Sequence, residues 1–115
     1  MSNIIIYGIP NCNSIKKTLD WCNTHKIYYT FHNYKKEGIH IDRLTAWCKA
    51  LGWEVVFNKK GTTWKSIAEQ HKNLTEKKAI EIMVENTSII KRPIIEKGKK
   101  FLVGFDEALL ADFLL

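Results

Sequence analysis

Cys12 is the residue of this chain whose type and position best suit covalent chemistry. It lies where a short apolar segment, Asn3–Gly8, gives way through Pro10 to an amphipathic segment that begins at Asn13. A thiol at the start of a helix faces backbone N–H groups without helical partners and the positive end of the helix dipole. Both favour the thiolate, which is the nucleophilic form of cysteine. We therefore expect Cys12 to be a reactive nucleophile, the alternative being a small residue that fills a turn.

The other two cysteines are expected in the core. Cys22 follows the apolar stripe of the same predicted helix, about 15 Å along it from Cys12, which is too far for a disulfide. Cys48 has the same helical phase as its apolar neighbours. Without a second thiol in reach, a reaction at Cys12 needs an external thiol to complete its cycle. Three cysteines without a CxxC pair also fit a reducing compartment, and the predicted location is cytoplasmic.

Two further segments contain candidate functional residues. Lys60 belongs to a basic turn beside hydroxyls, Lys59–Thr63, which suits an anion or carboxylate and equally well suits an exposed loop with a helix cap. Arg92 stands directly before Pro93, which disfavours the helical conformation for the arginine. The four histidines show no metal-ligand spacing, no metal is predicted, and none of them is selected as a partner for Cys12.

The hydrophobic pattern predicts the elements that must position these residues. Asn3–Gly8 and Ile27–Tyr34 are typical of strands, and the helical period of residues 13–24 between them completes a βαβ unit. The polar side chains of Asn11, Asn13 and Ser14 are expected to start that helix.

The rest of the chain predicts a helical block followed by a hairpin and a last helix. Helical spacing runs from Gly38 to Gly52, Val55–Phe57 forms a brief apolar patch, and Thr62 or Thr63 is expected to cap a helix that reaches Gln70. Thr75 is expected to cap a further helix, whose inner face holds Ala79, Ile80, Met83 and Val84. Two short strands, 94–96 and 101–103, flank a polar turn, and Asp106 caps the final helix. The predicted fold is α/β: a thioredoxin-like four-stranded mixed sheet with an all-helical insertion at about 38–86, in a single domain of residues 1–115.

Composition limits the classes of partner. The chain has 115 residues, and its net charge of +6 comes from 18 Lys and Arg against 12 Asp and Glu; 16 of the basic residues are Lys, ten of them in five scattered pairs. Such a surface is typical of solvated lysines, so nucleic-acid binding is not expected. No apolar run approaches the roughly 18 residues of a membrane span, and Met1–Asn3 leads into the first strand without the pattern of a signal peptide.

Several ordered segments resemble the ArsC/Spx (arsenate-reductase-like) family, and most closely its YffB-like subgroup. The segments that carry the resemblance are Ile6–Lys17, Leu51–Trp53, Asn58–Trp64, Ile89–Ile94 and Leu102–Phe105. Together they cover essentially the whole chain. The resemblance implies a thioredoxin fold with a helical insertion, in agreement with the pattern of apolar residues.

The resemblance also implies roles for individual residues. Cys12 would attack the substrate and would then be reduced again by glutathione or glutaredoxin. Glutathione would be a cosubstrate, and no cofactor would be permanently bound. Arg92 would bind an anion, and Pro93 would be cis and face Cys12. Lys60 and Arg92 would hold the carboxylates of glutathione or an anionic substrate, and the loop residues Asn11, Asn13 and Ser14 would complete the site.

The chain departs from the family pattern at three positions. Arsenate reductases of this type use three arginines around the oxyanion, whereas here Lys60 stands at the second position and Gly104 at the third. Ile15 occupies the place of the second cysteine of the CxxC switch that many Spx regulators carry. The hypothesis is therefore a glutathione-dependent thiol reductase. The alternatives are a Spx-like adaptor that binds RNA polymerase without catalysis, a weak arsenate reductase, and a fold retained without a current substrate.

Overall fold

The computed structural model describes residues 3–115, which divide between two compact units. The first unit combines the chain up to Glu37 with Arg92–Leu115, and the second is Gly38–Lys91. The helical insertion predicted for residues 38–86 therefore begins as expected and extends five residues further. That the chain forms a single domain stays a prediction.

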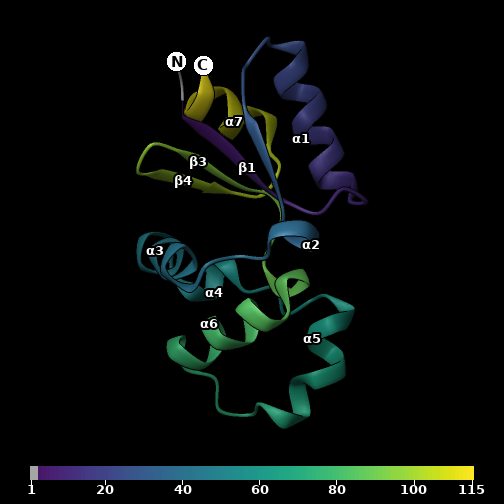
Figure 1. Cartoon of the computed structure of the whole chain (residues 1–115), viewed down its shortest axis with the longest axis vertical. Helices are drawn as coiled ribbons and strands as arrows, with labels where there is room; N and C mark the ends of the chain where they lie inside the picture. The colour runs from purple at the N-terminus through teal and green to yellow at the C-terminus, as the bar shows by residue number, and fades with distance from the viewer. Residues whose placement is uncertain (1–2) are drawn as a thin grey trace. The chain divides into compact units, whose positions relative to one another are not determined.

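The first unit is built on a four-stranded mixed sheet of order β2-β1-β3-β4 (Figure 1). Its strands are β1 (Ile4–Gly8), β2 (Thr30–Asn33), β3 (Ile94–Lys97) and β4 (Lys100–Val103). β1 pairs with β2 in parallel and with β3 in antiparallel fashion, and β3 and β4 form the predicted hairpin. The helices of this unit are α1 (Asn13–Thr24), α2 (Tyr34–Glu37) and α7 (Glu107–Leu114). This is the predicted α/β, thioredoxin-like arrangement.

One face of the sheet packs against α1 and α7, which Figure 1 shows beside it. Alternate strand residues point to this face because side chains alternate along a strand. The core on this side consists of Ile4, Ile6 and Ile95 from the strands with Trp21, Cys22, Leu110 and Leu114 from the two helices. The prediction that Cys22 is a core residue is confirmed, since its side chain has no exposed surface.

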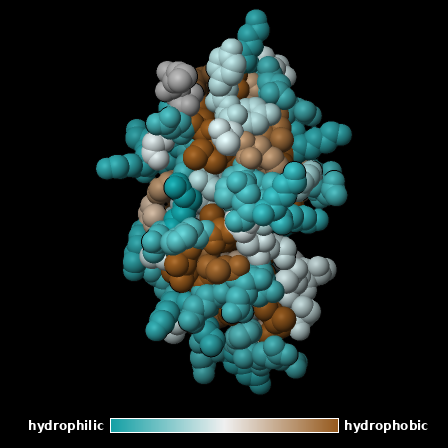
Figure 2. Space-filling view, in the orientation of Figure 1, coloured by the Kyte–Doolittle hydropathy of each residue, from teal (hydrophilic) through white to brown (hydrophobic). Residues whose placement is uncertain are grey.

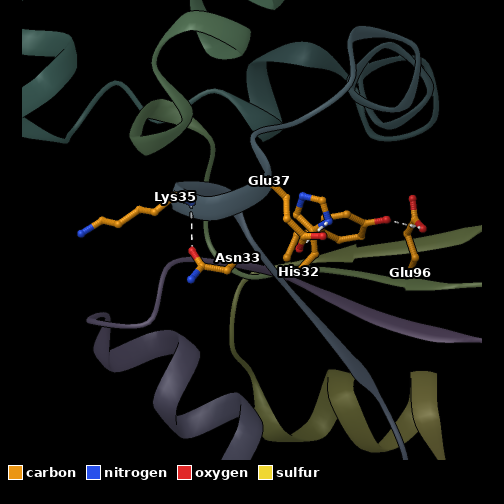
Figure 3. Close-up of polar contacts among 6 residues, drawn as sticks. His32, Asn33, Lys35, Glu37 and Glu96 are labelled. Atoms are coloured by element: carbon orange, nitrogen blue, oxygen red, sulfur yellow. Dashed lines mark hydrogen bonds and ion pairs between the residues drawn. The ribbon is translucent and has the colours of Figure 1, made fainter.

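The opposite face carries polar and aromatic side chains. The Tyr7 hydroxyl donates a hydrogen bond of 2.9 Å to Oε1 of Glu96, which is only 3% exposed. The ring of His32 lies 4.8 Å from the ring of Tyr7, and its Nδ1 lies 3.6 Å from Oε2 of Glu37 (Figure 3). Burial of a carboxyl group costs free energy unless the group is hydrogen-bonded, and Tyr7 supplies such a bond to Glu96.

The second unit is helical apart from one isolated bridge between Phe57 and Ile90. Its elements are α3 (Ile41–Leu51), α4 (Trp53–Val56), α5 (Thr62–Ile67), η1 (Ala68–Gln70), α6 (Glu76–Glu85) and η2 (Thr87–Ile89). Its buried apolar side chains include Leu44, Trp47, Cys48, Val56, Phe57, Ala79 and Met83, so the core position predicted for Cys48 is confirmed. Thr75 caps α6 as predicted, because its hydroxyl accepts from the Lys78 N–H.

Several predicted boundaries were wrong. The strand predicted over Ile27–Tyr34 is confined to Thr30–Asn33. The apolar patch Val55–Phe57, for which no element was predicted, is mostly helical because its first two residues belong to α4. The cap of α5 is Gly61 and not a threonine, and the helix passes into a 3₁₀ turn after Ile67. On α6 the side chains of Ala79, Ile80 and Met83 are buried as predicted, but the fourth buried side chain is Ile82, and Val84 is half-buried.

Hydrophilic side chains cover most of the face seen in Figure 2, with hydrophobic patches between them. Among residues 3–115, no helix combines the length and the apolar character needed to cross a membrane.

Candidate functional site

Cys12 is the N-cap residue of α1, in an extended backbone conformation with φ −142° and ψ 127°. The helix begins here because the Cys12 carbonyl accepts the first helical hydrogen bond, from the Lys16 N–H at 2.9 Å. The Cys12 side chain makes no capping hydrogen bond. The backbone N–H groups of Ile15 and Ser14 nevertheless act on the sulfur and favour its ionised form. The expected position of the thiol at the start of the first helix is therefore confirmed.

The surroundings of Cys12 favour its ionised form. Partial burial acts to raise the pKa of the thiol. The backbone N–H groups of Ile15 and Ser14, together with Arg92, lower the pKa and outweigh the effect of burial. The guanidinium of Arg92 contributes both its charge and a hydrogen bond. The resulting pKa lies below the ordinary value for cysteine. Burial has the opposite effect on the other two thiols, because it raises the pKa of Cys22 and of Cys48 to about 11.

The Arg92-Pro93 peptide bond is cis, as the family resemblance implied. Pro93 is buried and Arg92 is half-buried directly before β3. Because Tyr7 of β1 pairs with Ile94 of β3, this segment enters the sheet at the end where β1 leads into the loop of Cys12. The Gly104 N–H donates a hydrogen bond of 2.9 Å to the Pro93 carbonyl. Gly104, which stands at the position of the third arginine of the family pattern, therefore lies beside the Arg92-Pro93 segment.

The remaining predicted site residues have diverse surroundings. Asn11 and Asn13 are exposed, and Ser14 is half-buried and contributes its backbone N–H to the sulfur of Cys12. Lys60 belongs to the second unit, where its side chain is exposed and its backbone N–H donates to Oδ1 of Asn58 at 3.0 Å. A shared role of Lys60 and Arg92 in anion binding stays a prediction.

Tyr34 is a component that the sequence did not single out. It begins α2 directly after β2, and its ring lies 6.3 Å from the ring of Tyr7 and 5.8 Å from that of His32. Its hydroxyl is buried and has no hydrogen-bond partner among residues 3–115. Burial raises its pKa well above the ordinary value, as do Tyr7 and Glu96, while Arg92 opposes them. The charge of Arg92 therefore acts on both Cys12 and Tyr34.

Within the part of the chain that the structure describes, no three His, Cys, Asp or Glu side chains are grouped so that they could hold a metal ion. The chemistry available at Cys12 is that of a thiol whose ionisation is favoured by a nearby guanidinium. Such a site can attack an electrophilic sulfur or bind an anion.

The sheet, the thiol at the start of α1 and the cis-proline segment together define a thioredoxin-like protein with a single candidate nucleophile. The ArsC family model matches residues 7–113, and the chain belongs to the ArsC family.

Comparisons with known proteins agree with this membership. A solved structure named YffB (PA3664) protein is 41% identical, with a TM-score of 0.95 over 98% of this chain and 100% of that one. A solution structure of an arsenate reductase (ArsC) related protein from Brucella melitensis is 39% identical, with a TM-score of 0.77 over 98% and 96% of the two chains. The global transcriptional regulator Spx of Lactiplantibacillus plantarum is 24% identical over 96% of this chain and 86% of its own. The family thus includes similar proteins named for reduction and for regulation.

Proposed function

We propose that this protein is a thiol oxidoreductase that uses Cys12 as its nucleophile and glutathione as its cosubstrate. The observation that carries the proposal is the environment of the Cys12 sulfur. Two backbone N–H groups and the Arg92 guanidinium lower the pKa of this thiol, whereas the other two thiols of the chain have raised pKa values. The thiolate is therefore concentrated at one position of the chain.

The proposed reaction consists of two thiol–disulfide exchanges. In the first, the Cys12 thiolate attacks the glutathionyl sulfur of a mixed disulfide R–S–S–glutathione, so that a Cys12–glutathione disulfide forms and the R thiolate departs. In the second, the thiolate of a free glutathione attacks the glutathionyl sulfur on Cys12. This restores the Cys12 thiolate and yields glutathione disulfide, so that the two electrons that reduce the original substrate come from glutathione.

An external thiol is required because the chain offers no second thiol for the exchange. Cys22 lies on the buried side of α1 about three turns from Cys12, about 15 Å along the helix axis. Cys48 is 2% exposed and its pKa is raised, so its thiolate is scarce. Arg92 suits a carboxylate of glutathione because its guanidinium matches that group with two parallel donors. Such a cycle needs a reducing compartment, in agreement with the cytoplasmic location expected from the cysteines.

The direct test measures the rate of Cys12 alkylation by iodoacetamide as a function of pH, with peptide mass analysis to separate the three cysteines. The apparent pKa of Cys12 is expected below the value of about 8.5 for free cysteine. Arg92→Lys keeps the positive charge but loses the planar donors, and Arg92→Gln loses both. The pKa is expected to rise modestly in the first variant and further in the second.

A turnover assay tests the cosubstrate. Reduced protein is first incubated with a glutathionylated model peptide. Glutathione, glutathione reductase and NADPH are then added, and the consumption of NADPH measures the regeneration of the Cys12 thiol. The wild type is expected to accumulate one glutathionyl group on Cys12 and to turn over, whereas Cys12→Ser does neither. A normal Cys12 pKa, or regeneration by dithiothreitol but not by glutathione, contradicts the proposal. Lys60→Gln in the same assay tests the predicted carboxylate contact through an increased KM for glutathione.

Arsenate is disfavoured as the substrate by the surroundings of Pro93. The residue whose N–H donates to the Pro93 carbonyl is Gly104, which offers no side chain where the resemblance implies a third arginine. Lys60 in addition lacks the two parallel donors of an arginine. Turnover of arsenate with glutathione and glutaredoxin at a rate similar to that of the disulfide would contradict this exclusion.

The similarity to Spx favours a second candidate function, a regulator that binds RNA polymerase. Ile15 argues against a disulfide switch at Cys12, because a buried isoleucine occupies the position of the second cysteine. Capture of purified polymerase by the wild type and by Cys12→Ser with equal affinity, without disulfide turnover, would support the regulator. Turnover without capture would support the enzyme.

A further inference from the structure

Gly8, the last residue of β1, leaves space that the side chain of Ile15 fills. A Cβ atom built on Gly8 would lie 2.7 Å from Cγ1 of Ile15 and still closer to its Cδ1. Carbon atoms in contact lie about 3.5–4.0 Å apart, so even a methyl group at this position displaces Ile15. Ile15 is 1% exposed, and its relocation to solvent would remove an apolar side chain from the core.

Ile15 also connects this contact to the nucleophile. Its own backbone N–H is the leading group that lowers the pKa of Cys12, followed by the N–H of Ser14. Ile15 is β-branched and lies in the first turn of α1, where such a side chain has essentially one rotamer. A group that pushes on its Cγ1 therefore moves the backbone of this turn in preference to rotating the side chain.

We propose that Gly8 is a positioning residue for the Cys12 nucleophile. The absence of a side chain at Gly8 lets Ile15 seat against the end of β1, and this contact fixes the direction of the Ile15 and Ser14 N–H groups toward the Cys12 sulfur. The inference rests on the proposed function, since it assigns to Gly8 the control of thiolate formation in the same site. The sequence carried a signal for it, because a glycine that ends an isoleucine-rich strand often marks a close approach.

The test is Gly8→Ala, read by the pH dependence of Cys12 alkylation. The apparent pKa of Cys12 is expected to rise toward the value of free cysteine. The alkylation rate below pH 7 is expected to fall about twofold to fourfold for a pKa shift of half a unit to one unit, because the loss of thiolate outweighs the greater nucleophilicity of a thiolate of higher pKa. The limiting rate at high pH is not expected to fall, because the fully formed thiolate is at least as nucleophilic as in the wild type.

Two companion variants separate positioning from general damage. Gly8→Ala/Ile15→Ala removes both crowded carbon atoms and is expected to bring the apparent pKa back toward that of Ile15→Ala alone. Leu110→Ala truncates a buried side chain of α7 in the core of the first unit, so it is expected to destabilise the protein while leaving the Cys12 pKa unchanged. Circular dichroism verifies the fold of each variant.

The outcomes are distinguishable from failure of the proposed function. An ordinary pKa in the wild-type protein overturns the proposed function itself. A low pKa in the wild type that persists in folded Gly8→Ala, or a pKa increase equal to that of Leu110→Ala, overturns the role of Gly8. If Gly8→Ala alone does not fold, the test uses the double variant Gly8→Ala/Ile15→Val. Valine lacks the Cδ1 atom of isoleucine but retains the crowded Cγ1. The apparent pKa of Cys12 in the double variant is therefore expected to exceed that in Ile15→Val by the same amount.

Discussion

Two buried tyrosines of the first unit have hydroxyl groups in opposite situations. Tyr7 donates to Oε1 of Glu96 at 2.9 Å, whereas the Tyr34 hydroxyl has no partner among residues 3–115. Their rings lie 6.3 Å apart, so the difference is local. A buried hydroxyl without a partner costs about 1–3 kcal/mol, whereas a hydrogen bond to a charged group contributes about 1.5–3 kcal/mol. Removal of the two hydroxyls should therefore change stability in opposite directions.

Tyr34→Phe is expected to raise the free energy of unfolding by about 1 kcal/mol, because it removes an unsatisfied polar group. Tyr7→Phe is expected to lower it by about 1–3 kcal/mol, because a bond to Glu96 is lost. Urea denaturation measures both, with each variant serving as the control for the other. A loss of stability in Tyr34→Phe would mean that its hydroxyl does have a partner in the folded protein.

At the scale of single residues, the sequence predicted the candidate nucleophile and Arg92 but not Tyr34 and Glu96. Cys12 and Arg92 could be identified because their positions before a helix and before Pro93 are local features of the chain. The contributions of Tyr34 and Glu96 depend on pairs far apart in sequence, such as the bond between Tyr7 and Glu96. No local pattern encodes such pairs.

Among the elements, α1 ends in a turn that requires an unusual backbone conformation. Lys26 has φ +57°, the Ile27 N–H donates to the Cys22 carbonyl at 2.9 Å, and the Lys26 N–H donates to that of Asn23 at 3.2 Å. This pair of bonds is the Schellman motif, in which glycine is the preferred residue at the left-handed position. A lysine there has the steric cost of its Cβ, about 1–2 kcal/mol.

Lys26→Gly is expected to raise the free energy of unfolding by about 1 kcal/mol, because glycine adopts the left-handed conformation without that cost. Lys17→Gly is the matched control, since it makes the same exchange at an exposed position within α1. Its expected effect is a loss of about 1 kcal/mol. Thermal denaturation compares the two, and equal losses in both variants would contradict the argument.

The limits of β2 show why element boundaries were predicted less well than element types. Residues 27–29 have the composition of a strand, yet Tyr28 is 88% exposed and pairing begins at Thr30. Thr30 is the partner of Ile5, so pairing with β2 begins one residue after the start of β1 at Ile4. Asn33 pairs with Gly8, the last residue of β1, and Tyr34 turns into α2. The length of a neighbouring strand is not written in the segment itself.

For the molecule as a whole, the ionised Cys12 links stability to pH. Its pKa is lowered in the folded protein, so between the folded and unfolded pKa values the unfolded chain binds more protons. The stabilisation is fully present above the unfolded value of about 8.5, and it is lost as the pH falls through the lowered pKa. Cys22 and Cys48, whose pKa values are raised, act in the opposite sense at high pH.

The difference in unfolding free energy between the wild type and Cys12→Ser isolates the contribution of Cys12, because the other two thiols are common to both. This difference is expected to increase in favour of the wild type as the pH rises toward about 8.5. Below the pKa of Cys12 in the folded protein, the difference is expected to be constant. Urea denaturation across this pH range, with a reductant present, measures it. A difference that does not vary with pH would show that the thiol ionises equally in both states.

In the proposed cycle, the N–H groups of Ser14 and Ile15 would also affect the lifetime of the disulfide between Cys12 and glutathione. A sulfur whose negative charge is well stabilised departs readily when its disulfide is attacked, because it is a good leaving group. The donors that prepare Cys12 for attack therefore also hasten the step that releases it. A covalent intermediate on Cys12 should be brief wherever free glutathione is abundant, and should persist where glutathione is depleted.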